Sequence, residues 1–486
     1  MASPERSLTA RHLATLLASW RDVGGISYLR LAETIRLLVL DGRIPLQSQL
    51  PAERELAAAL GVSRTTVSSA YARLRDAGYL RSRRGSRSWT TLPSGERTTP
   101  PPALGPATDP NVLDLAHAAL PAPAAAIQAA VARATTDLTR HLGGHGYDIR
   151  GLPELRSALA DYYGAASLPT TPEHILVTHG AQHGLALALR LYVGPGDRVL
   201  VEHPTYPNAL DAVRRAGGRL VPAAMDRERG WDVEMLEATI RQSAPRLAYL
   251  VPDFQNPTGH LMSMPGREQI GALLRRTRTP VVIDETLREL PLAGAPVPRP
   301  FAAVAESDDL ITLGSTGKSF WGGLRVGWIR AAPDVIDRLA AIRPSIDLGS
   351  SVLDQLVVVT LLRNSSAVLE PRRRAITDGR NTLMNLLNQR LPGLRYRPPE
   401  GGLSLWVELE ESVSSRLTVA AEQHGLQLAA GPRFGVDAAF ERFLRIPYTL
   451  PADRLEIAVE RLAAAYRSVL DRVPSTVPYD GARSVA

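Results

Sequence analysis

The sequence predicts an α/β protein in two parts: a small helical unit at the N-terminus, then a large α/β domain with a mostly parallel sheet and a smaller α+β lobe. Its 486 residues exceed what one hydrophobic core usually organises. Six prolines within residues 92–112 mark a semi-extended linker. From about residue 113, helical patterns alternate with short apolar runs, which is typical of parallel strands covered by helices.

The expected boundaries follow these changes in composition. The N-terminal unit spans 1–91, the linker 92–112 and the large domain 113–472, whose smaller lobe begins near residue 391; residues 473–486 form a tail. No run approaches the roughly 18 apolar residues of a membrane span, and MASPERSLTARHL lacks the apolar core of a secretion signal. The chain contains no cysteine, which excludes disulfides. We therefore expect a soluble, cytoplasmic protein.

The net charge of +7 is concentrated at one end of the chain. Residues 1–100 hold 15 arginines and 8 acidic residues, which leaves 41 charges of each sign for the remaining residues. A basic surplus at one end predicts a polyanionic partner there, with a solvated basic face as the alternative.

Lysine is almost absent from the sequence. The 56 basic residues are 55 arginines and one lysine, Lys318. Arginine supplies positive charge as well as lysine does, but it cannot deprotonate or form an imine with an aldehyde. Lys318 is therefore the candidate for covalent chemistry.

Two short helices are predicted in the N-terminal unit, at residues 53–60 and from 64 to about 77. Ser63 closes the turn between them and is placed as the N-cap of the second helix. This is helix-turn-helix spacing. The exposed start of the second helix can reach base edges or phosphates, and it carries Arg64, Thr65 and Thr66.

Residues 79–89 predict a basic β-hairpin wing that turns at Gly85. The stretch LPAERELAAALGVSRTTVSSAYARLRDAGYL resembles the winged helix-turn-helix of the GntR family of bacterial repressors, and the match covers roughly residues 28–91. A bundle that binds protein instead of DNA is the alternative. The resemblance implies double-stranded operator DNA as partner, with these contact residues: Arg54, Ser63, Arg64, Thr65, Thr66, Arg84 and Gly85. The amphipathic segment 8–20 is interpreted as an extra packing helix.

Several residues of the large domain lie at or beside the ends of predicted strands. Lys318 follows a strand that runs into small residues, and Ser315 and Arg325 are near enough in sequence to donate to a phosphate. Asp284 ends an apolar strand, where open α/β sheets bind ligands. Asn256 begins an Asn-Pro-Thr-Gly turn after another strand. A cap, a surface acid or a plain turn is the competing interpretation for each residue taken alone.

One short segment and two single residues complete the candidate site. Gly180, Ala181 and Gln182 open a helix whose free amides suit a phosphate. Tyr206 follows a strand and can stack on a flat ring, or else be an ordinary loop tyrosine. Arg445 is a charge inside an apolar strand, so it needs a carboxylate ligand or a structural ion pair. An imine lysine, an acid, a phosphate cradle and a carboxylate clamp are what pyridoxal chemistry requires.

In this order along the chain, the residues resemble those of fold-type I aminotransferases related to aspartate aminotransferase, over about residues 113–472. The resemblance implies pyridoxal 5′-phosphate as cofactor, with Lys318 forming the imine and Arg445 binding a substrate carboxylate. It also implies that Asp284 pairs with the ring nitrogen and Asn256 with the ring hydroxyl. YDIRGLPELR, beginning at Tyr147, is similar to that fold's motif near the dimer partner's active site. No metal site is expected.

The sequence departs from that pattern at one place. These proteins usually carry a tyrosine two or three residues after the aspartate, whereas this chain has Thr286 and Leu287. Thr286 is a shorter and less acidic donor, so the departure favours sensing over efficient transamination.

A GntR-type winged helix, a proline-rich linker and an aminotransferase-like domain together resemble the MocR family of bacterial regulators. The resemblance implies a head-to-tail homodimer whose effector is an amine, an amino acid or the cofactor itself. Two alternatives stay open: an active aminotransferase with an autoregulatory DNA-binding domain, and a DNA-binding protein without a cofactor.

Overall fold

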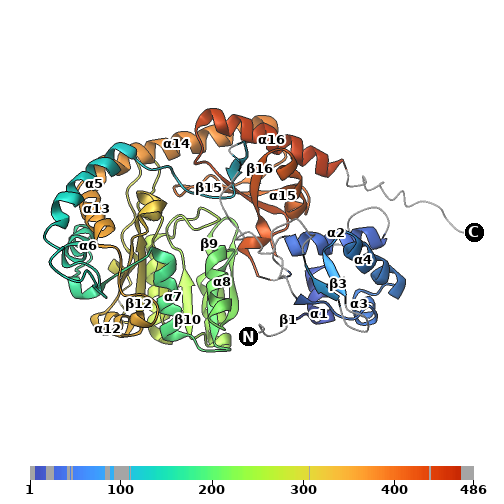
Figure 1. Ribbon diagram of the computed structural model, residues 1–486, viewed down its shortest axis with the longest axis horizontal. Coiled ribbons are helices and arrows are strands. Elements are labelled where there is room, and N and C mark those ends of the chain that lie inside the picture. The colour runs from blue at the N-terminus through green and yellow to red at the C-terminus, as the bar shows by residue number, and fades with distance from the viewer. Residues whose placement is uncertain are drawn as a thin grey trace, which may run out of the picture.

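The computed structural model describes residues 6–17, 27–40, 44, 48–82, 88–91, 109, 111–305, 307–436 and 439–471. Its strands form three sheets, one in the N-terminal domain, one in the large domain and one in the small lobe (Figure 1). Within the described residues, no single helix is long and apolar enough to cross a membrane, although the bent pair α13 (Val352–Arg363) and α14 (Ser365–Arg390) passes that test by length and composition alone.

The N-terminal domain packs four helices against a small sheet of strand order β1-β2-β4-β3. Its helices are α1 (Ala10–Leu16), α2 (Ser27–Leu40), α3 (Glu53–Leu60) and α4 (Arg64–Asp76). Its strands are β1 (Arg6–Ser7), β2 (Ser48–Gln49), β3 (Leu80–Ser82) and β4 (Ser88–Thr90). The predicted helix-turn-helix is confirmed, because α3 and α4 share one core and Gly61 ends α3 in the left-handed conformation at φ 63°. Helix α1 buries Leu13 and Leu16 in that core, as expected for a packing helix.

The large domain is built on an eight-stranded sheet that is mostly parallel, as predicted. In spatial order its strands are β6 (Ile175–Thr178), β13 (Gly327–Arg330), β12 (Leu310–Ser315), β11 (Val281–Asp284), β10 (Leu247–Leu250), β7 (Arg198–His203), β8 (Arg219–Asp226) and β9 (Gly230–Trp231). Strand β13 runs antiparallel between β12 and β6.

Helices cover both faces of this sheet, which explains why its central strands are apolar throughout. In β10, Ala248 and Leu250 belong to one core, and Leu247 and Tyr249 belong to the other. The helices are α5 (Ala124–Leu138), α6 (Pro153–Ala165), α7 (Ala181–Tyr192), α8 (Pro207–Arg215), α9 (Val233–Ser243), α10 (Met264–Thr277), α11 (Thr316–Ser319), α12 (Pro333–Ile342) and α13 (Val352–Arg363).

The small lobe contains a five-stranded sheet, β14 (Arg395–Tyr396), β15 (Ser404–Glu408), β17 (Phe443–Pro447), β16 (Leu426–Ala430) and β5 (Leu113–Leu115). Its helices are α14 (Ser365–Arg390), α15 (Ser414–Gln423) and α16 (Ala452–Leu470), and Figure 1 shows α14 and α16 along its outer edge. Strand β5 pairs in parallel with β16. The first residues after the linker therefore belong to the small-lobe sheet. They were predicted from the sequence to be part of the large unit.

Short 3-10 helices connect several of these elements. They are η1 (Pro172–His174), η2 (Phe301–Ala303), η3 (Gly322–Leu324), η4 (Arg343–Ser345) and η5 (Gly431–Phe434).

Candidate functional site

The start of α4 presents an exposed polar edge. The Ser63 hydroxyl accepts a hydrogen bond from the Thr66 amide at 3.1 Å, which caps the helix. The Arg64 side chain is 73% exposed, with the carboxylate of Glu53 at 3.8 Å. Arg54 and Thr65 are exposed as well. These positions, predicted to contact DNA, are therefore accessible to solvent.

The wing has the predicted hairpin form. Strands β3 and β4 pair antiparallel, with Arg81 opposite Trp89. The predicted contacts Arg84 and Gly85 lie outside the described residues.

Lys318 lies on α11, directly after β12, and its amine is enclosed although other atoms of the residue keep some exposure. Its Nζ donates to the carbonyl of Ala118 at 2.6 Å. Burial, reinforced by the nearby Arg445 guanidinium and opposed by Asp284, lowers the pKa of Lys318 from 10.5 to about 8. Roughly a tenth of this amine is therefore a neutral nucleophile at pH 7, far more than for an ordinary lysine.

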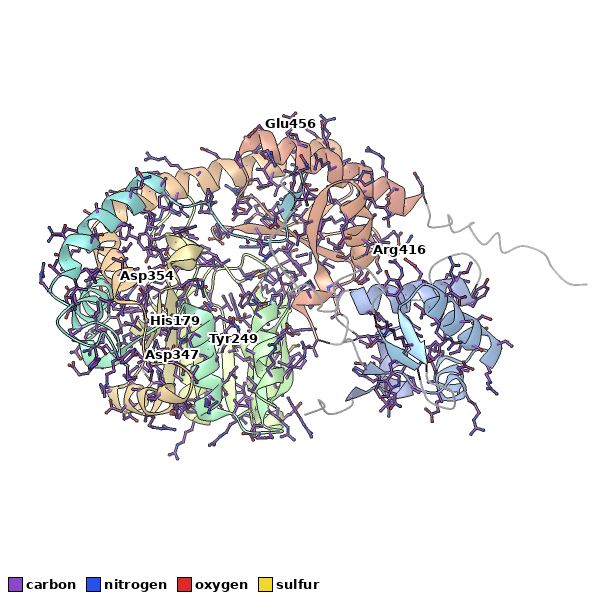
Figure 2. The ribbon with its side chains drawn as sticks, in the orientation of Figure 1. His179, Tyr249, Asp347, Asp354, Arg416 and Glu456 are labelled. Atoms are coloured by element: carbon purple, nitrogen blue, oxygen red, sulfur yellow. The ribbon has the colours of Figure 1, made fainter. Side chains whose placement is uncertain are left out.

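Asp284 ends β11, and its buried carboxylate accepts two hydrogen bonds. The Thr286 amide donates to Oδ1 at 3.0 Å, and the Tyr249 hydroxyl donates to Oδ2 at 2.7 Å. Tyr249 comes from β10 and lies inside the large domain (Figure 2). The sequence analysis missed it. The available signal was a hydroxyl within an otherwise aliphatic strand, because a buried tyrosine hydroxyl usually has a partner.

The start of α7 lies beside Arg325. Gly180 precedes the helix at φ 78°, and a Cβ placed on it would lie 3.0 Å from Nη2 of Arg325. That guanidinium donates to the His179 carbonyl at 3.0 Å. The amides of Ala181 and Gln182 are in the first turn, where helices have no acceptor for them. Backbone donors and a cation thus converge, as a phosphate requires.

Two side chains of this region form hydrogen bonds within the protein. Gln182 Nε2 donates to the Asn208 carbonyl at 3.2 Å, and its Oε1 is buried without a partner among the described residues. Ser315 Oγ accepts from the Gly317 amide at 3.0 Å, which caps α11. The Ser315 hydroxyl hydrogen stays available as a donor.

A small cavity adjoins Lys318. Asn256 and Leu287 line it, and Asn256 Oδ1 is buried without a hydrogen-bond partner in the described part of the chain. Burial, followed by the Asp284 carboxylate, raises the pKa of the Tyr206 hydroxyl.

Arg445 on β17 is buried at the other end of the site. Its Nη2 donates to the Ala116 carbonyl, its guanidinium lies 5.1 Å from the Phe434 ring centre, and its Nε meets no acceptor among the described residues. Burial is the main cause that lowers its pKa to about 10. Over the ranges that the structure describes, no carboxylate forms an ion pair with it, so the structural ion pair weighed from the sequence is not found there.

Of three further residues named in the sequence analysis, one lies away from this cluster, and the other two contribute a backbone amide and an aliphatic surface. Tyr147 is 64% exposed on the loop before α6, beside His145. Thr286 donates its amide to Asp284. Leu287 offers the cavity an aliphatic surface.

Glu202 supports the turn of Asn256 and was not predicted. It is buried near the end of β7 and accepts hydrogen bonds from Trp231, from the Val251 amide and from Gln255 at 2.7 to 2.9 Å. Gln255 precedes Asn256, so this network fixes the turn that carries the amide. Burial raises the pKa of Glu202 to about 7.

His179, His183 and Asp347 are spaced as metal ligands are, and Figure 2 shows His179 beside Asp347. The His183 Nδ1 accepts from the His179 amide at 3.1 Å, so the neutral ring carries its proton on Nε2, which faces Asp347 at 3.7 Å. Arg343 already pairs with Asp347 at 2.5 Å. The protonated nitrogen and the competing guanidinium favour a hydrogen-bonded cluster over a metal site.

The large-domain residues fit pyridoxal phosphate on three counts. There is an enclosed amine of low pKa, a carboxylate held by two donors, and a helix start beside a guanidinium. A model of the family "Aminotransferase class I and II" matches residues 110–462. The chain belongs to this family. A model of "Bacterial regulatory proteins, gntR family" matches residues 27–88.

The similar proteins fall into two groups. The 2-aminoadipate transaminase of Thermus thermophilus is 32% identical over 372 residues, covering 74% of this chain and 91% of the relative. The HTH-type transcriptional regulator YdcR of Escherichia coli is 28% identical over 465 residues, covering 90% of this chain and 98% of the relative. The probable rhizopine catabolism regulatory protein MocR of Rhizobium meliloti is 30% identical, covering 65% of this chain and 68% of the relative. The predicted MocR-type fusion is confirmed.

A solved structure gives the same relationship for the large domain. LysN, the α-aminoadipate aminotransferase of Thermus thermophilus, superposes with a TM-score of 0.69 at 30% identity, covering 74% of this chain and 94% of that one. That structure is a complex with N-(5′-phosphopyridoxyl)-L-leucine. The predicted fold-type I architecture is confirmed.

We expect the rate of covalent capture of pyridoxal phosphate to follow the fraction of the Lys318 amine that is neutral. Because the neutral form reacts, the capture rate should rise with pH and level off above about 8 rather than above 10.5. In Arg445→Gln, loss of the neighbouring cation should raise the pKa of Lys318, so the midpoint should move up by about half a pH unit or more. Stopped-flow absorbance over pH 6 to about 11 measures both. An unchanged midpoint in Arg445→Gln would show that the two groups do not interact.

Tyr249→Phe should weaken cofactor retention about tenfold, because a hydrogen bond to a buried carboxylate contributes roughly 1.5–3 kcal/mol. Tyr396→Phe is the matched control, because the Tyr396 hydroxyl donates hydrogen bonds to Asn388 Oδ1 and to the Met384 carbonyl in the small lobe. Equilibrium dialysis against pyridoxal phosphate measures the change. Equal retention in the two variants contradicts the assignment of Tyr249 to Asp284.

Proposed function

We propose that the protein is a pyridoxal phosphate-dependent transcription regulator, which binds operator DNA and senses an amine, an amino acid or the cofactor itself. One observation carries the proposal. An enclosed lysine amine of pKa about 8, influenced by the charges of Arg445 and Asp284, occurs in the same chain as an exposed recognition-helix start. The first arrangement serves carbonyl chemistry and the second serves contact with a polyanion.

The large-domain residues take these roles toward the cofactor, which when bound supplies an electron-withdrawing ring. Lys318 offers the amine that captures the aldehyde, and when free it accepts or returns a proton. Asp284 would accept a hydrogen bond from the protonated ring nitrogen, and Tyr249 donates to its Oδ2. Asn256 would donate its amide to the ring hydroxyl, and Tyr206 would pack on the ring. The phosphate would be held by Gly180, Ala181, Gln182, Ser315 and Arg325.

Arg445 sets the ligand class. A buried guanidinium that meets only carbonyl and aromatic partners in the described chain binds a carboxylate strongly, since charge-assisted bonds in a dry site are short and strong. A ligand that reaches both Lys318 and Arg445 carries an amine and a carboxylate, as an amino acid does.

The DNA-binding surface takes its contacts from α3, α4 and the wing. Arg64 and Arg54 bind phosphates or base edges, and Ser63, Thr65 and Thr66 present hydroxyls at the helix start. Arg84 and Gly85 at the wing tip follow from the family resemblance. We place this activity in the cytoplasm, where the chain has access to operator DNA.

The active assembly is a head-to-tail homodimer. Supporting this, α5 and α13 pack together, and they and loops of the large domain expose large apolar side chains. These side chains are Val131, Leu142, Tyr147, Ile346, Leu348 and Leu353. A second copy covers such a surface, and Tyr147 then serves the partner's site.

An active aminotransferase is the second candidate, favoured by one specific observation. The amine of Lys318 titrates near pH 8, as a base for proton shuttling requires, and a transaminase stands among the similar proteins. Leu287 and Thr286 in place of a phenol count against efficient turnover.

Arg64→Ala should weaken binding to the operator about tenfold or more and leave the cofactor spectrum unchanged, because a base or phosphate contact is worth roughly 1–3 kcal/mol. Arg454→Ala, an exposed arginine of α16, is the control. Fluorescence anisotropy with a duplex selected in vitro by the wild-type protein gives the affinities. Normal binding by Arg64→Ala would refute the recognition-helix assignment.

A multiple-turnover assay distinguishes a regulator from an active aminotransferase. With L-2-aminoadipate and 2-oxoglutarate, the regulator is expected to give a spectral change and at most one equivalent of product per chain. Coupled assays over many hours measure the keto acid. Sustained production beyond one equivalent rejects a pure sensor and establishes the enzyme.

A further inference from the structure

The segment Ala116–Pro121, which we call the strap, crosses from the small lobe to the large domain. It contains no helix or strand and joins β5 to α5. Strand β5 belongs to the small-lobe sheet, whereas α5 packs on α13. In the sequence, only β5 separates the strap from the proline-rich linker. The strap is therefore the part of the ligand site nearest in sequence to the DNA-binding domain.

Three buried cationic groups donate to backbone carbonyls of the strap. The bonds run from Arg445 Nη2 to Ala116 O, from Lys318 Nζ to Ala118 O at 2.6 Å, and from Arg372 Nη1 to Pro121 O at 2.9 Å. The donors come from β17, α11 and α14 respectively. Two of them are the groups that the proposed function assigns to the ligand.

Arg372 has no evident purpose apart from the strap. It is 8% exposed, its Nε and Nη2 have no hydrogen-bond partner among the described residues, and burial alone lowers its pKa to about 10. Buried arginines are normally paired with an acid. Here the carbonyl of Pro121 is the one acceptor that the described part of the chain offers it. A buried charge without an acidic partner lowers the stability of the fold. The purpose of Arg372 is therefore to hold the strap.

The strap is also fixed at its origin. Asp114 Oδ1 accepts from the amides of Ala116 at 2.8 Å and His117 at 3.0 Å, and Oδ2 meets the His117 ring at 2.7 Å. Asp114 itself is paired in register with Gln427 of β16. A displacement of Ala116 is therefore passed to β5 rather than absorbed in a slack loop.

We propose that the strap transmits ligand occupancy of the Lys318–Arg445 site to the linker, an inference that rests on the proposed function. A ligand carboxylate competes with the neutral Ala116 carbonyl for Arg445, and it is the stronger acceptor. Lys318 has already released Ala118 in the cofactor-loaded protein, because its amine then holds the cofactor. Arg372, which has no role toward the ligand, then holds the strap alone. The strap and β5 shift, and the linker leaves the domain from a different position.

Arg372→Met tests this in the full-length, cofactor-loaded protein. Methionine keeps much of the length of the side chain and removes a poorly partnered buried charge, so the melting temperature should stay the same or rise. Arg374→Met, an exposed arginine two positions along α14, is the matched control. Arg372→Lys restores one donor toward Pro121. Hydrogen–deuterium exchange of amides 116–120 and affinity for the in vitro-selected duplex are the two measurements.

In Arg372→Met the strap amides should exchange about tenfold faster, and the affinity for the duplex should change at least about fivefold, in the direction that a ligand produces. Arg374→Met should match the wild type, and Arg372→Lys should recover most of both properties. Fast exchange with unchanged DNA affinity would overturn the transmission, and unchanged exchange would overturn the anchoring role. A wild-type protein that selects no duplex or holds no cofactor would instead refute the proposed function.

Discussion

Two buried cations facing one buried carboxylate constrain the whole ligand site. Lys318 and Arg445 lie close enough that the guanidinium disfavours charge on the amine, and Asp284 offsets only part of that repulsion. Burying unpaired charge is costly unless the group becomes neutral or gains an anion. The lysine loses its proton readily, with a pKa of about 8, and the arginine contacts a carbonyl and an aromatic ring. The site is thereby prepared for a carbonyl group at one end and a carboxylate at the other.

The remaining structure supplies the geometry that this charge arrangement needs. Parallel strands deliver Asp284 and Lys318 to the same edge of the sheet, and β10 adds Tyr249 behind the aspartate. Glu202 secures the turn of Asn256 through Gln255. The small lobe contributes Arg445 and, through β5, the strap that both cations hold. A ligand that satisfies the cations must therefore disturb the segment that leads to the linker.

The sequence alone predicted the fold class, the main strands and the candidate residues, because each of these has a local signature. Lys318 was conspicuous as the one lysine, and the helix-turn-helix follows from its cap and apolar spacing. Tyr249 and Glu202 were missed because their hydrogen-bond partners are distant in sequence. The position of β5 was missed for the same reason, since a three-residue strand has no periodicity to detect. The carbonyl partners of Arg445 and Arg372 are backbone groups, which carry no side-chain signal at all.

The proposed function requires that the buried amine of Lys318 holds pyridoxal phosphate. Borohydride reduction of the purified full-length protein loaded with the cofactor, followed by peptide mass spectrometry, tests this requirement. We expect one phosphopyridoxyl group per chain, located on Lys318, and none in a Lys318→Arg variant. If the protein gains no adduct, or gains it only at the N-terminal amine, Lys318 does not hold the cofactor.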